Sequence, residues 1–255
     1  MHNSDAVISR PREWILFRAG FMLRLRTKVR CLEEGSGKIE DVLNRQLEHW
    51  ESTYSEEPSL YGGRPSFGAE RAVQQFKAEG SREILELGCG HGRDTLFFAQ
   101  RGLRVYAIDY SKTAIDALTR AAQVSGLCNS IIPMCHDVRK PLPFPSESMD
   151  GCYSHMLYCM ALTMSQLESL SKEVKRILKP NGLNLFTVRT KEDPHYARGI
   201  ARGEDMYEAD GFVVHFFDRE KVQSLAEGYE IIGVQQFQEG ELPRKLFFVT
   251  LRKQD

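Results

Sequence analysis

Short apolar runs alternate with amphipathic stretches along most of the chain. The short runs predict buried strands, and apolar residues at three- and four-residue steps predict helices. Strands and helices that alternate in this way are typical of an α/β protein with a parallel sheet. The predicted strands are 84–87, 103–109, 131–135, 149–157, 183–188, 229–237 and 245–252. The predicted helices are 39–50, 67–78, 95–100, 112–124, 165–178 and 218–227.

Composition places the chain among ordinary globular proteins. It has 255 residues, of which 42% are hydrophobic and 27% charged, enough for one sizeable core with some decoration. The net charge of −1 gives no global basic field, so nucleic acid is not the expected partner. The six cysteines include no C-x-x-C pair and predict reduced thiols. No apolar run is long enough to span a membrane and none has the pattern of a secretion signal, so we expect a cytoplasmic protein.

Residues 1–38 form a basic segment unlike the rest. Six arginines and one lysine lie between Arg10 and Arg30, against a single acid, Glu13. Apolar residues at helical spacing through this stretch predict an amphipathic helix. It packs on the domain or on a second subunit as a homodimer contact, or it binds a membrane surface or RNA; a mitochondrial-type leader is a further interpretation. We therefore divide the chain into an extension, 1–38, and a domain, 39–255.

The most informative motif is the run I-L-E-L-G-C-G-H-G-R-D at 84–94. A buried strand ends there in three glycines at alternate positions, Gly88, Gly90 and Gly92, and a helix follows. Glycine lacks a Cβ, so the backbone can adopt positive φ and approach a ligand closely. A strand, a glycine-rich turn and a helix start are typical of nucleotide-like ligand sites at the edge of a parallel sheet, although a short glycine motif can also be a simple turn.

Two acids at the ends of the following strands strengthen the ligand interpretation. Asp109 ends the second predicted strand, where a carboxylate can accept hydrogen bonds from both hydroxyls of a ribose. Asp137 follows the third strand, where it can meet an exocyclic amine of adenine while Val138 flanks the ring. Each acid alone fits helix capping or a turn. Together, after a glycine turn, they predict an adenosine site.

These residues resemble the motifs of class I S-adenosylmethionine-dependent methyltransferases. The run 86–92 is similar to their first motif, Asp109 to their ribose-binding acid, Asp137–Val138 to their adenine-side pair, and L-K-P-N-G at 178–182 to the turn before their fifth strand. The resemblance implies a Rossmann-like, seven-stranded, mostly parallel sheet with the last strand antiparallel and helices on both faces. In this chain the N-terminal helical extension would be added to that fold.

The resemblance also implies a cofactor, S-adenosylmethionine, a product, S-adenosylhomocysteine, and no metal. Glu86 precedes the glycines, where its charge suits an ammonium group and would repel a pyrophosphate. Ser154, at the end of the fourth predicted strand, is a candidate for the sulfonium end. The predicted cofactor-binding residues are Glu86, Gly88, Cys89, Gly90, Gly92, Asp109, Tyr110, Asp137, Val138 and Ser154.

Four residues are candidates for the acceptor side. The aromatic stretch 49–66 and the tail that reaches Arg244 are similar to segments of tellurite-resistance and thiopurine-type methyltransferases. Tyr61 lies beside two glycines that can act as a hinge, which favours a lid. His155 and His215, at a strand end and in the insertion 189–217, are the titratable candidates, and packing roles remain open for both. That family usually has histidine before the arginine, whereas this chain has Pro243.

The predicted function is transfer of a methyl group to a small acceptor, with a thiol or chalcogen compound favoured because no unambiguous base is visible. Two alternatives are a methyltransferase of RNA or protein docked by the basic N-terminal helix, and a cofactor-binding protein without catalysis. A nicotinamide oxidoreductase is a weaker alternative, because its fingerprint is G-x-G-x-x-G whereas the spacing here is G-x-G-x-G.

Overall fold

The computed structural model describes residues 39–57, 62–240 and 244–254. The predicted helix of the extension 1–38 and the lid candidate Tyr61 lie outside these ranges. The helices are α1 (Ile39–Asn44), α2 (Gln46–Glu56), α3 (Phe67–Ala78), α4 (Arg93–Gln100), α5 (Lys112–Val124), α6 (Met164–Ile177) and α7 (Arg219–Ser224). The strands are β1 (Glu83–Leu87), β2 (Arg104–Asp109), β3 (Ile131–Cys135), β4 (Met149–His155), β5 (Leu178–Arg189), β6 (Ile200–Gly203), β7 (Met206–Ala209), β8 (Phe212–His215), β9 (Tyr229–Glu239) and β10 (Arg244–Lys253).

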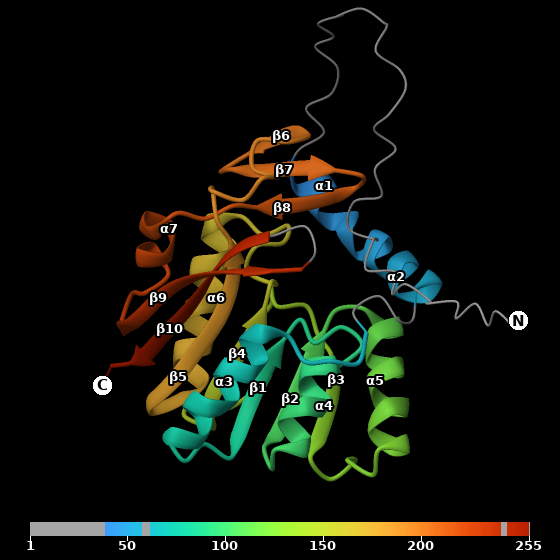
Figure 1. The fold of residues 1–255 in the computed structure, drawn as a ribbon, viewed down its shortest axis with the longest axis vertical. Helices are drawn as coiled ribbons and strands as arrows, with labels where there is room; N and C mark the ends of the chain where they lie inside the picture. The colour runs from blue at the N-terminus through green and yellow to red at the C-terminus, as the bar shows by residue number, and fades with distance from the viewer. Residues whose placement is uncertain (1–38, 58–61, 241–243, 255) are drawn as a thin grey trace, which may run out of the picture. The chain divides into compact units, whose positions relative to one another are not determined.

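The main sheet has seven strands in the order β3-β2-β1-β4-β5-β10-β9 (Figure 1). Strands β1 to β5 pair in parallel, and β10 runs antiparallel to both of its neighbours. The predicted fold class is therefore confirmed, including the reversed last strand. Leu87, the last residue of β1, lies opposite Ile108 of β2 and Ser154 of β4. This register brings the carboxyl ends of three strands to one edge of the sheet.

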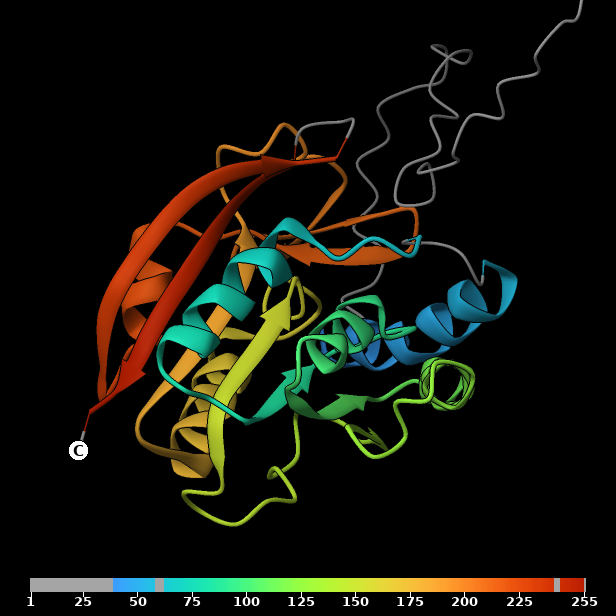
Figure 2. The ribbon, with the colours of Figure 1, turned by 60° about the horizontal axis from the view of Figure 1, so that its bottom comes forward.

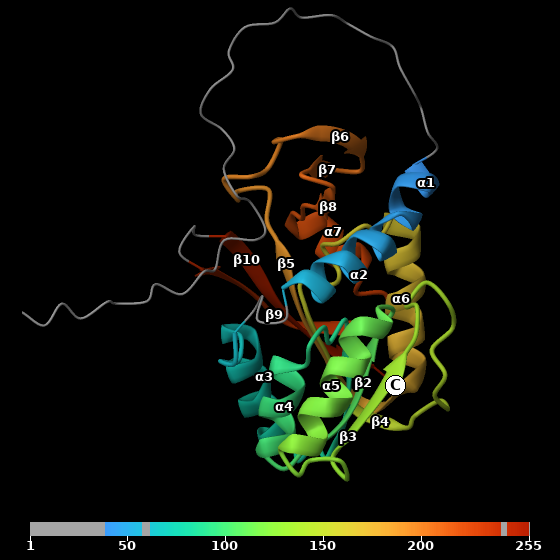
Figure 3. The ribbon, with the colours of Figure 1, turned by 90° about the vertical axis from the view of Figure 1, so that its right-hand side faces the viewer.

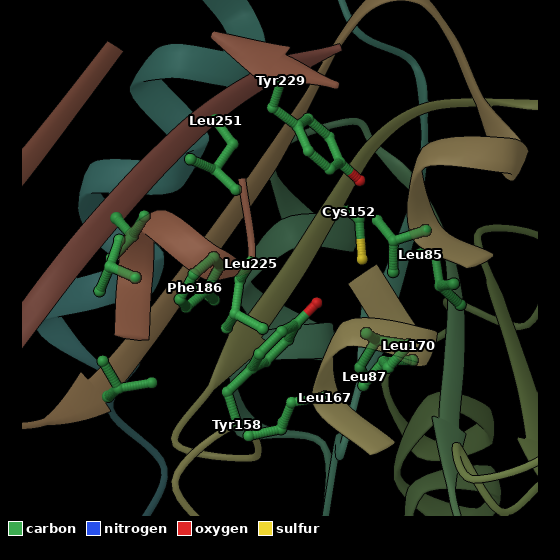
Figure 4. Packing of buried hydrophobic residues seen from close by; sticks show 14 of the residues in the cluster. Leu85, Leu87, Cys152, Tyr158, Leu167, Leu170, Phe186, Leu225, Tyr229 and Leu251 are labelled. Carbon is green, nitrogen blue, oxygen red and sulfur yellow. The ribbon is translucent and has the colours of Figure 1, made fainter. Parts of the chain in front are cut away.

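Helices cover both faces of this sheet, as the apolar periodicity requires (Figure 3). The apolar sides of α3, α4 and α5 pack on one face around Phe76, Phe98 and Leu118. Helix α6 covers the other face. Its buried residues recur at three- and four-residue steps: Leu167 and Leu170, shown in Figure 4, and then Val174 and Ile177. The two clusters hold the edge that carries the loops after β1, β2 and β4 in a fixed position.

The insertion after β5 forms a second sheet of three antiparallel strands in the order β6-β7-β8. Lys191 pairs with Asp205 and Asp218, and Lys221 also pairs with Asp205, so ion pairs tie this small sheet to β5 and to the start of α7. The sequence indicated an insertion at 189–217 but not that it contains strands.

Helices α1 and α2 depart from the sequence-based prediction. One helix was expected at 39–50, followed by an aromatic loop, whereas the chain turns at Arg45 and α2 continues to Glu56. Trp50 and Tyr54 are one helical turn apart and each is only 7% exposed. Burial of both rings on one face explains why helix replaces the loop that local residue preferences suggested.

Candidate functional site

The glycine loop 88–92 connects β1 to α4 at the edge of the main sheet. Gly88, Gly90 and Gly92 all have positive φ, of 69°, 52° and 85°. Backbone N–H groups of Gly88 and Cys89 donate to the carbonyl of Ile108, at 2.8 and 3.1 Å, so the loop is anchored to β2. A Cβ at Gly88 would lie 3.1 Å from the Leu157 side chain, and one at Gly92 would collide with Leu118. Glycine is therefore required at these positions by conformation and by space.

Asp109 lies directly against this loop. Its carboxylate accepts hydrogen bonds from the N–H of Gly90 and of Ser111, both at 2.9 Å. It is 5% exposed, and burial raises its pKa to about 6 despite those hydrogen bonds. A buried carboxylate with spare lone pairs beside a glycine turn suits a ligand that donates hydroxyl hydrogen bonds.

Glu86 points into the protein under the same loop. Thr95 of α4 donates to its carboxylate at 2.6 Å. Burial, followed by the nearby charge of Asp94, raises the pKa of Glu86 well above its ordinary value. Asp94 itself accepts hydrogen bonds from the backbone and hydroxyl of Ser66. An approaching ammonium group would favour the ionised form of Glu86, because it would add an opposite charge to an acidic environment.

Cys89 has a buried side chain, and burial raises the pKa of its thiol well above the ordinary value. Its sulfur lies 3.7 Å from the carbonyl of Gly90. The thiol is therefore protonated and unsuited to act as a nucleophile. Cys89 contributes its backbone to the loop.

The loop after β3 supplies the third group of predicted residues. Asp137 accepts hydrogen bonds from the Arg139 guanidinium at 2.7–3.0 Å. Burial alone would raise the pKa of Asp137, but these bonds outweigh it and hold the pKa below its usual value. Tyr110 follows Asp109 in the chain, and burial, followed by the charge of Asp109, raises the pKa of its hydroxyl. Val138, on the same loop, packs against the core beneath.

Ser154 ends the row of cofactor-side candidates at the carboxyl end of β4. Its side chain is fully buried, and its hydroxyl has no hydrogen-bond partner among the described residues. An unpaired buried hydroxyl is costly unless another group satisfies it. The Ser154 hydroxyl, the glycine cradle and the carboxylate of Asp109 together provide hydrogen-bonding groups that fit a polar, adenosine-like ligand.

Helix α2 lies over this edge of the sheet and was missed as part of the site. Glu51 accepts hydrogen bonds from the N–H groups of Lys112 and Thr113 at the start of α5, at 2.5 and 3.3 Å. The Tyr54 hydroxyl would be 3.0 Å from a Cβ at Gly90, and its ring packs on His91 with centroids 4.7 Å apart. The four-residue spacing of Trp50 and Tyr54 was the available signal, and it indicated a helical face.

His155 lies at the end of β4 in a small polar cluster. Its Nε2 is 3.2 Å from Oε2 of Glu239 on β9, and its Nδ1 is 3.0 Å from the hydroxyl of Thr187 on β5. Burial alone would raise the pKa of Glu239, but the hydrogen bond and charge of His155 lower it to about 2. Both ring nitrogens therefore lie close to a polar side chain. Sequence reasoning missed Glu239 and Thr187, because strand pairing brings them from distant segments.

His215 is completely buried within β8. Its Nδ1 bonds the carbonyl of Leu162 at 2.9 Å, and its Nε2 lies 2.9 Å from Nζ of Lys221. Burial and the Lys221 charge lower its pKa to about 4, so it is neutral at pH 7. This placement favours the packing role left open for His215, because both nitrogens contact groups of the protein.

Arg244 begins β10, opposite Glu239, and is partly exposed. Its side chain makes no hydrogen bond or ion pair with another described residue, so its guanidinium can serve an anionic group. Tyr61, the fourth acceptor-side candidate, is not described. The structure therefore brings the cofactor-side residues together and leaves the acceptor side less defined.

Comparison with known proteins agrees with this geometry. Residues 84–182 match a family model described as a methyltransferase domain. Phosphoethanolamine N-methyltransferase 3 of Arabidopsis thaliana is 33% identical over 40% of this chain and 20% of its own length. Malonyl-[acyl-carrier protein] O-methyltransferase of Serratia marcescens is 28% identical over 46% of this chain and 42% of its own. The chain thus spans less than half the length of either relative.

A solved structure extends the similarity of fold to most of the chain. It is the 1,6-didemethyltoxoflavin-N1-methyltransferase of Burkholderia thailandensis with its substrate and S-adenosylhomocysteine bound. The TM-score is 0.68 at 17% identity, covering 88% of this chain and 94% of that one. No helix in the described ranges is long and apolar enough to cross a membrane.

Proposed function

We propose that this protein is an S-adenosylmethionine-dependent methyltransferase that acts on a small molecule. The observation that carries the proposal is that the glycine cradle, Asp109 and the loop with Asp137 meet at one edge of the sheet, inside the segment that matches a methyltransferase domain: Asp109 accepts from Gly90, and the end of β3, just before Asp137, pairs with Asp109. The bound product in the toxoflavin methyltransferase of the same fold supports the choice of cofactor.

Each element of the site has a distinct part in binding. The backbone of 86–92 receives the amino-acid portion of the cofactor, with Glu86 as the acid that matches its ammonium group. Asp109, beside Tyr110, accepts from the ribose hydroxyls. Asp137 accepts from the adenine amine while Val138 contacts the ring. Ser154, whose hydroxyl is unpaired among the described residues, lies toward the sulfonium end.

When bound, the cofactor supplies a methyl group on a positively charged sulfur, which leaves as a neutral thioether. The residues of the site have to align the acceptor with that methyl group and exclude water. Helix α2 suits the second task, because the buried ring of Tyr54 lies against the glycine loop at Gly90.

The acceptor that fits this chain is already ionised at neutral pH. A neutral amine or hydroxyl would need a base within hydrogen-bond reach. Among the described candidates, His155 has both nitrogens occupied, and so has His215. A thiolate, a chalcogen anion or a carboxylate needs no such base. Arg244, without a charged partner among the described residues, suits an anion of this kind.

The relatives do not decide the acceptor atom, since one name states N-methylation and the other O-methylation. The small sheet β6–β8 extends beyond the same end of β5 and is our candidate for the acceptor wall. The extension 1–38 remains a predicted docking segment, for a second copy of the chain or a larger substrate.

Calorimetric titration with S-adenosylmethionine, S-adenosylhomocysteine and NADH tests the cofactor assignment. We expect micromolar binding of the first two and none of NADH. Incubation with S-adenosylmethionine and a panel of thiols, chalcogen oxyanions and carboxylates should then yield S-adenosylhomocysteine by mass spectrometry. No binding of either sulfur compound would overturn the proposal. Binding without turnover across the panel and added amines and alcohols would instead favour a non-catalytic cofactor-binding protein.

A further inference from the structure

Helix α2 contacts two parts of the molecule that the proposed reaction would use separately. In Figures 1 and 3 it lies between β8 and α5. Its second half touches loops predicted to receive the cofactor, through Glu51 at the start of α5 and Tyr54 at Gly90. Its first half touches β8, in the candidate acceptor wall, through Gln46 and Trp50. The preceding helix adds a third loop, because Asn44 accepts a hydrogen bond from Arg139 at 2.7 Å.

Gln46 makes the polar connection to the acceptor wall. Its side-chain N–H donates to the carbonyl of Gly211 at 2.8 Å, and its side-chain oxygen accepts from the N–H of Val213 at 3.1 Å. Both amide atoms are thus paired with one strand end, and the residue is 5% exposed. Such a two-point contact fixes the position of a helix along a strand better than apolar packing does.

Apolar contacts support this connection. Trp50 packs on Phe212 with ring centroids 4.9 Å apart. Val42 and Leu43 of α1 form a buried cluster with Met206 and Val213 of the small sheet. Helices α1 and α2 should therefore move together with β7 and β8 as one unit. Sliding of the helices relative to the strands would expose this cluster and break the Gln46 hydrogen bonds.

We propose that Gln46 is a positioning residue through which α2 couples the cofactor loops to the acceptor wall. This inference rests on the proposed function. Helices α1 and α2 contact groups that belong to the proposed cofactor site or lie next to it. These are Gly90, the turn after Asp109, and Arg139, whose guanidinium donates to Asp137. A ligand that rearranges these groups changes the free energy of α2 docking, and Gln46 transmits that change to β8. The cofactor thereby sets the acceptor wall before the acceptor binds.

Hydrogen–deuterium exchange of the full chain with and without S-adenosylhomocysteine tests this coupling. In the wild type we expect the ligand to slow exchange in both 86–92 and 206–215. In Gln46→Ala we expect slowing at 86–92 to persist and slowing at 206–215 to fall by a factor of about 5 or more, the lower range for coupled sites. Glu48→Ala, an exposed change on the same helix, should behave like the wild type.

The outcomes separate coupling from simple support. A purely structural Gln46 would raise exchange of 206–215 equally with and without ligand, and that result would overturn the proposal. Protection of 86–92 without protection of 206–215 in the wild type would also overturn it. Absence of protection at both segments, with no heat of binding, would instead remove the proposed function on which it rests. If Gln46→Ala does not fold, Gln46→Glu replaces it, since it differs by one atom and keeps the acceptor for Val213.

Discussion

Replacement of Asp109 by asparagine should weaken cofactor binding while it stabilises the ligand-free protein. The wild-type carboxylate is buried, and burial raises its pKa from 3.8 to about 6. Between these values the folded state binds more protons than the unfolded state. Stability therefore falls as pH rises from about 4 to 6 and stays at the lower level above that range. Asparagine has no charge to bury and should lack this loss.

The magnitude follows from the size of the shift. About two pKa units correspond to an upper limit of about 3 kcal/mol at neutral pH. Asparagine can accept only one of the two backbone N–H bonds from Gly90 and Ser111, and the other donor, left buried and unpaired, costs about 1–3 kcal/mol. We therefore expect Asp109→Asn to be more stable than the wild type at pH 8 by up to about 2 kcal/mol, with the advantage lost near pH 4. Urea denaturation at both pH values measures this difference.

Binding should change in the opposite direction. In the proposed complex, ribose hydroxyls donate to the charged carboxylate of the wild type, and loss of such bonds costs about 1.5–3 kcal/mol, or about 10- to 150-fold in affinity. The ligand favours ionised Asp109, so S-adenosylhomocysteine binding should tighten as pH rises toward 6 and should release protons at pH 5.5. Calorimetry in two buffers with different ionisation enthalpies detects that release, which Asp109→Asn should reduce but not abolish, because Glu86 also has a raised pKa and faces the ammonium group in the proposed complex.

One combination of results would refute the ribose assignment. It is an Asp109→Asn variant that folds, binds S-adenosylhomocysteine as tightly as the wild type and shows the same pH dependence. A variant that loses both stability and affinity for S-adenosylhomocysteine at pH 8 would also contradict the reasoning. That result would mean that the Asp109 carboxylate stabilises the fold, instead of destabilising the ligand-free protein in order to bind a ligand.

Two further predictions concern the framework. Gly92→Ala should lower the free energy of unfolding more than Gly102→Ala does. Both positions have positive φ, which costs an alanine about 1–2 kcal/mol. Only at Gly92 does the new Cβ also meet Leu118, which adds about 1–3 kcal/mol. Equal losses of thermal stability would contradict this. His215→Gln should reduce acid sensitivity, because the lowered pKa of about 4 makes the wild type lose up to about 3 kcal/mol between pH 6.5 and 4. Parallel urea curves for variant and wild type over that range would argue against a buried neutral histidine.

The fold was predictable because its signals are local. The strand runs, the glycine turn and the amphipathic periodicity of Met164–Ile177 each lie within one short segment, and the structure confirms the elements they predict. Residues 39–57 were predicted less well. The turn-forming residues after His49 favour a loop, but Trp50 and Tyr54 gain enough burial on one face to extend α2. Tertiary packing outweighed local preference there.

The candidate site shows the same difference between local sequence signals and contacts made by folding. The glycine motif and the acids at the strand ends are each recognisable in sequence, since parallel strands bring their carboxyl ends to a common edge. The partners of these residues are not. Glu239 reaches His155 from β9, Thr187 from β5, and Gln46 reaches Val213 across most of the chain. No spacing rule relates such pairs, so their roles appear only when the chain is folded.

The difference between local and long-range signals also separates the two sides of the candidate site. Residues recognisable from local patterns form the proposed cofactor side, whereas the proposed acceptor side depends on contacts between distant segments. The two histidines show the difference: in sequence both are plausible bases, yet the folded chain commits His215 to Leu162 and Lys221 and His155 to Glu239 and Thr187. With those nitrogens occupied, an acceptor that arrives ionised is the simplest solution. Substitutions that alter acceptor choice should therefore be sought where segments meet, at Arg244 and along β8, rather than in the glycine loop.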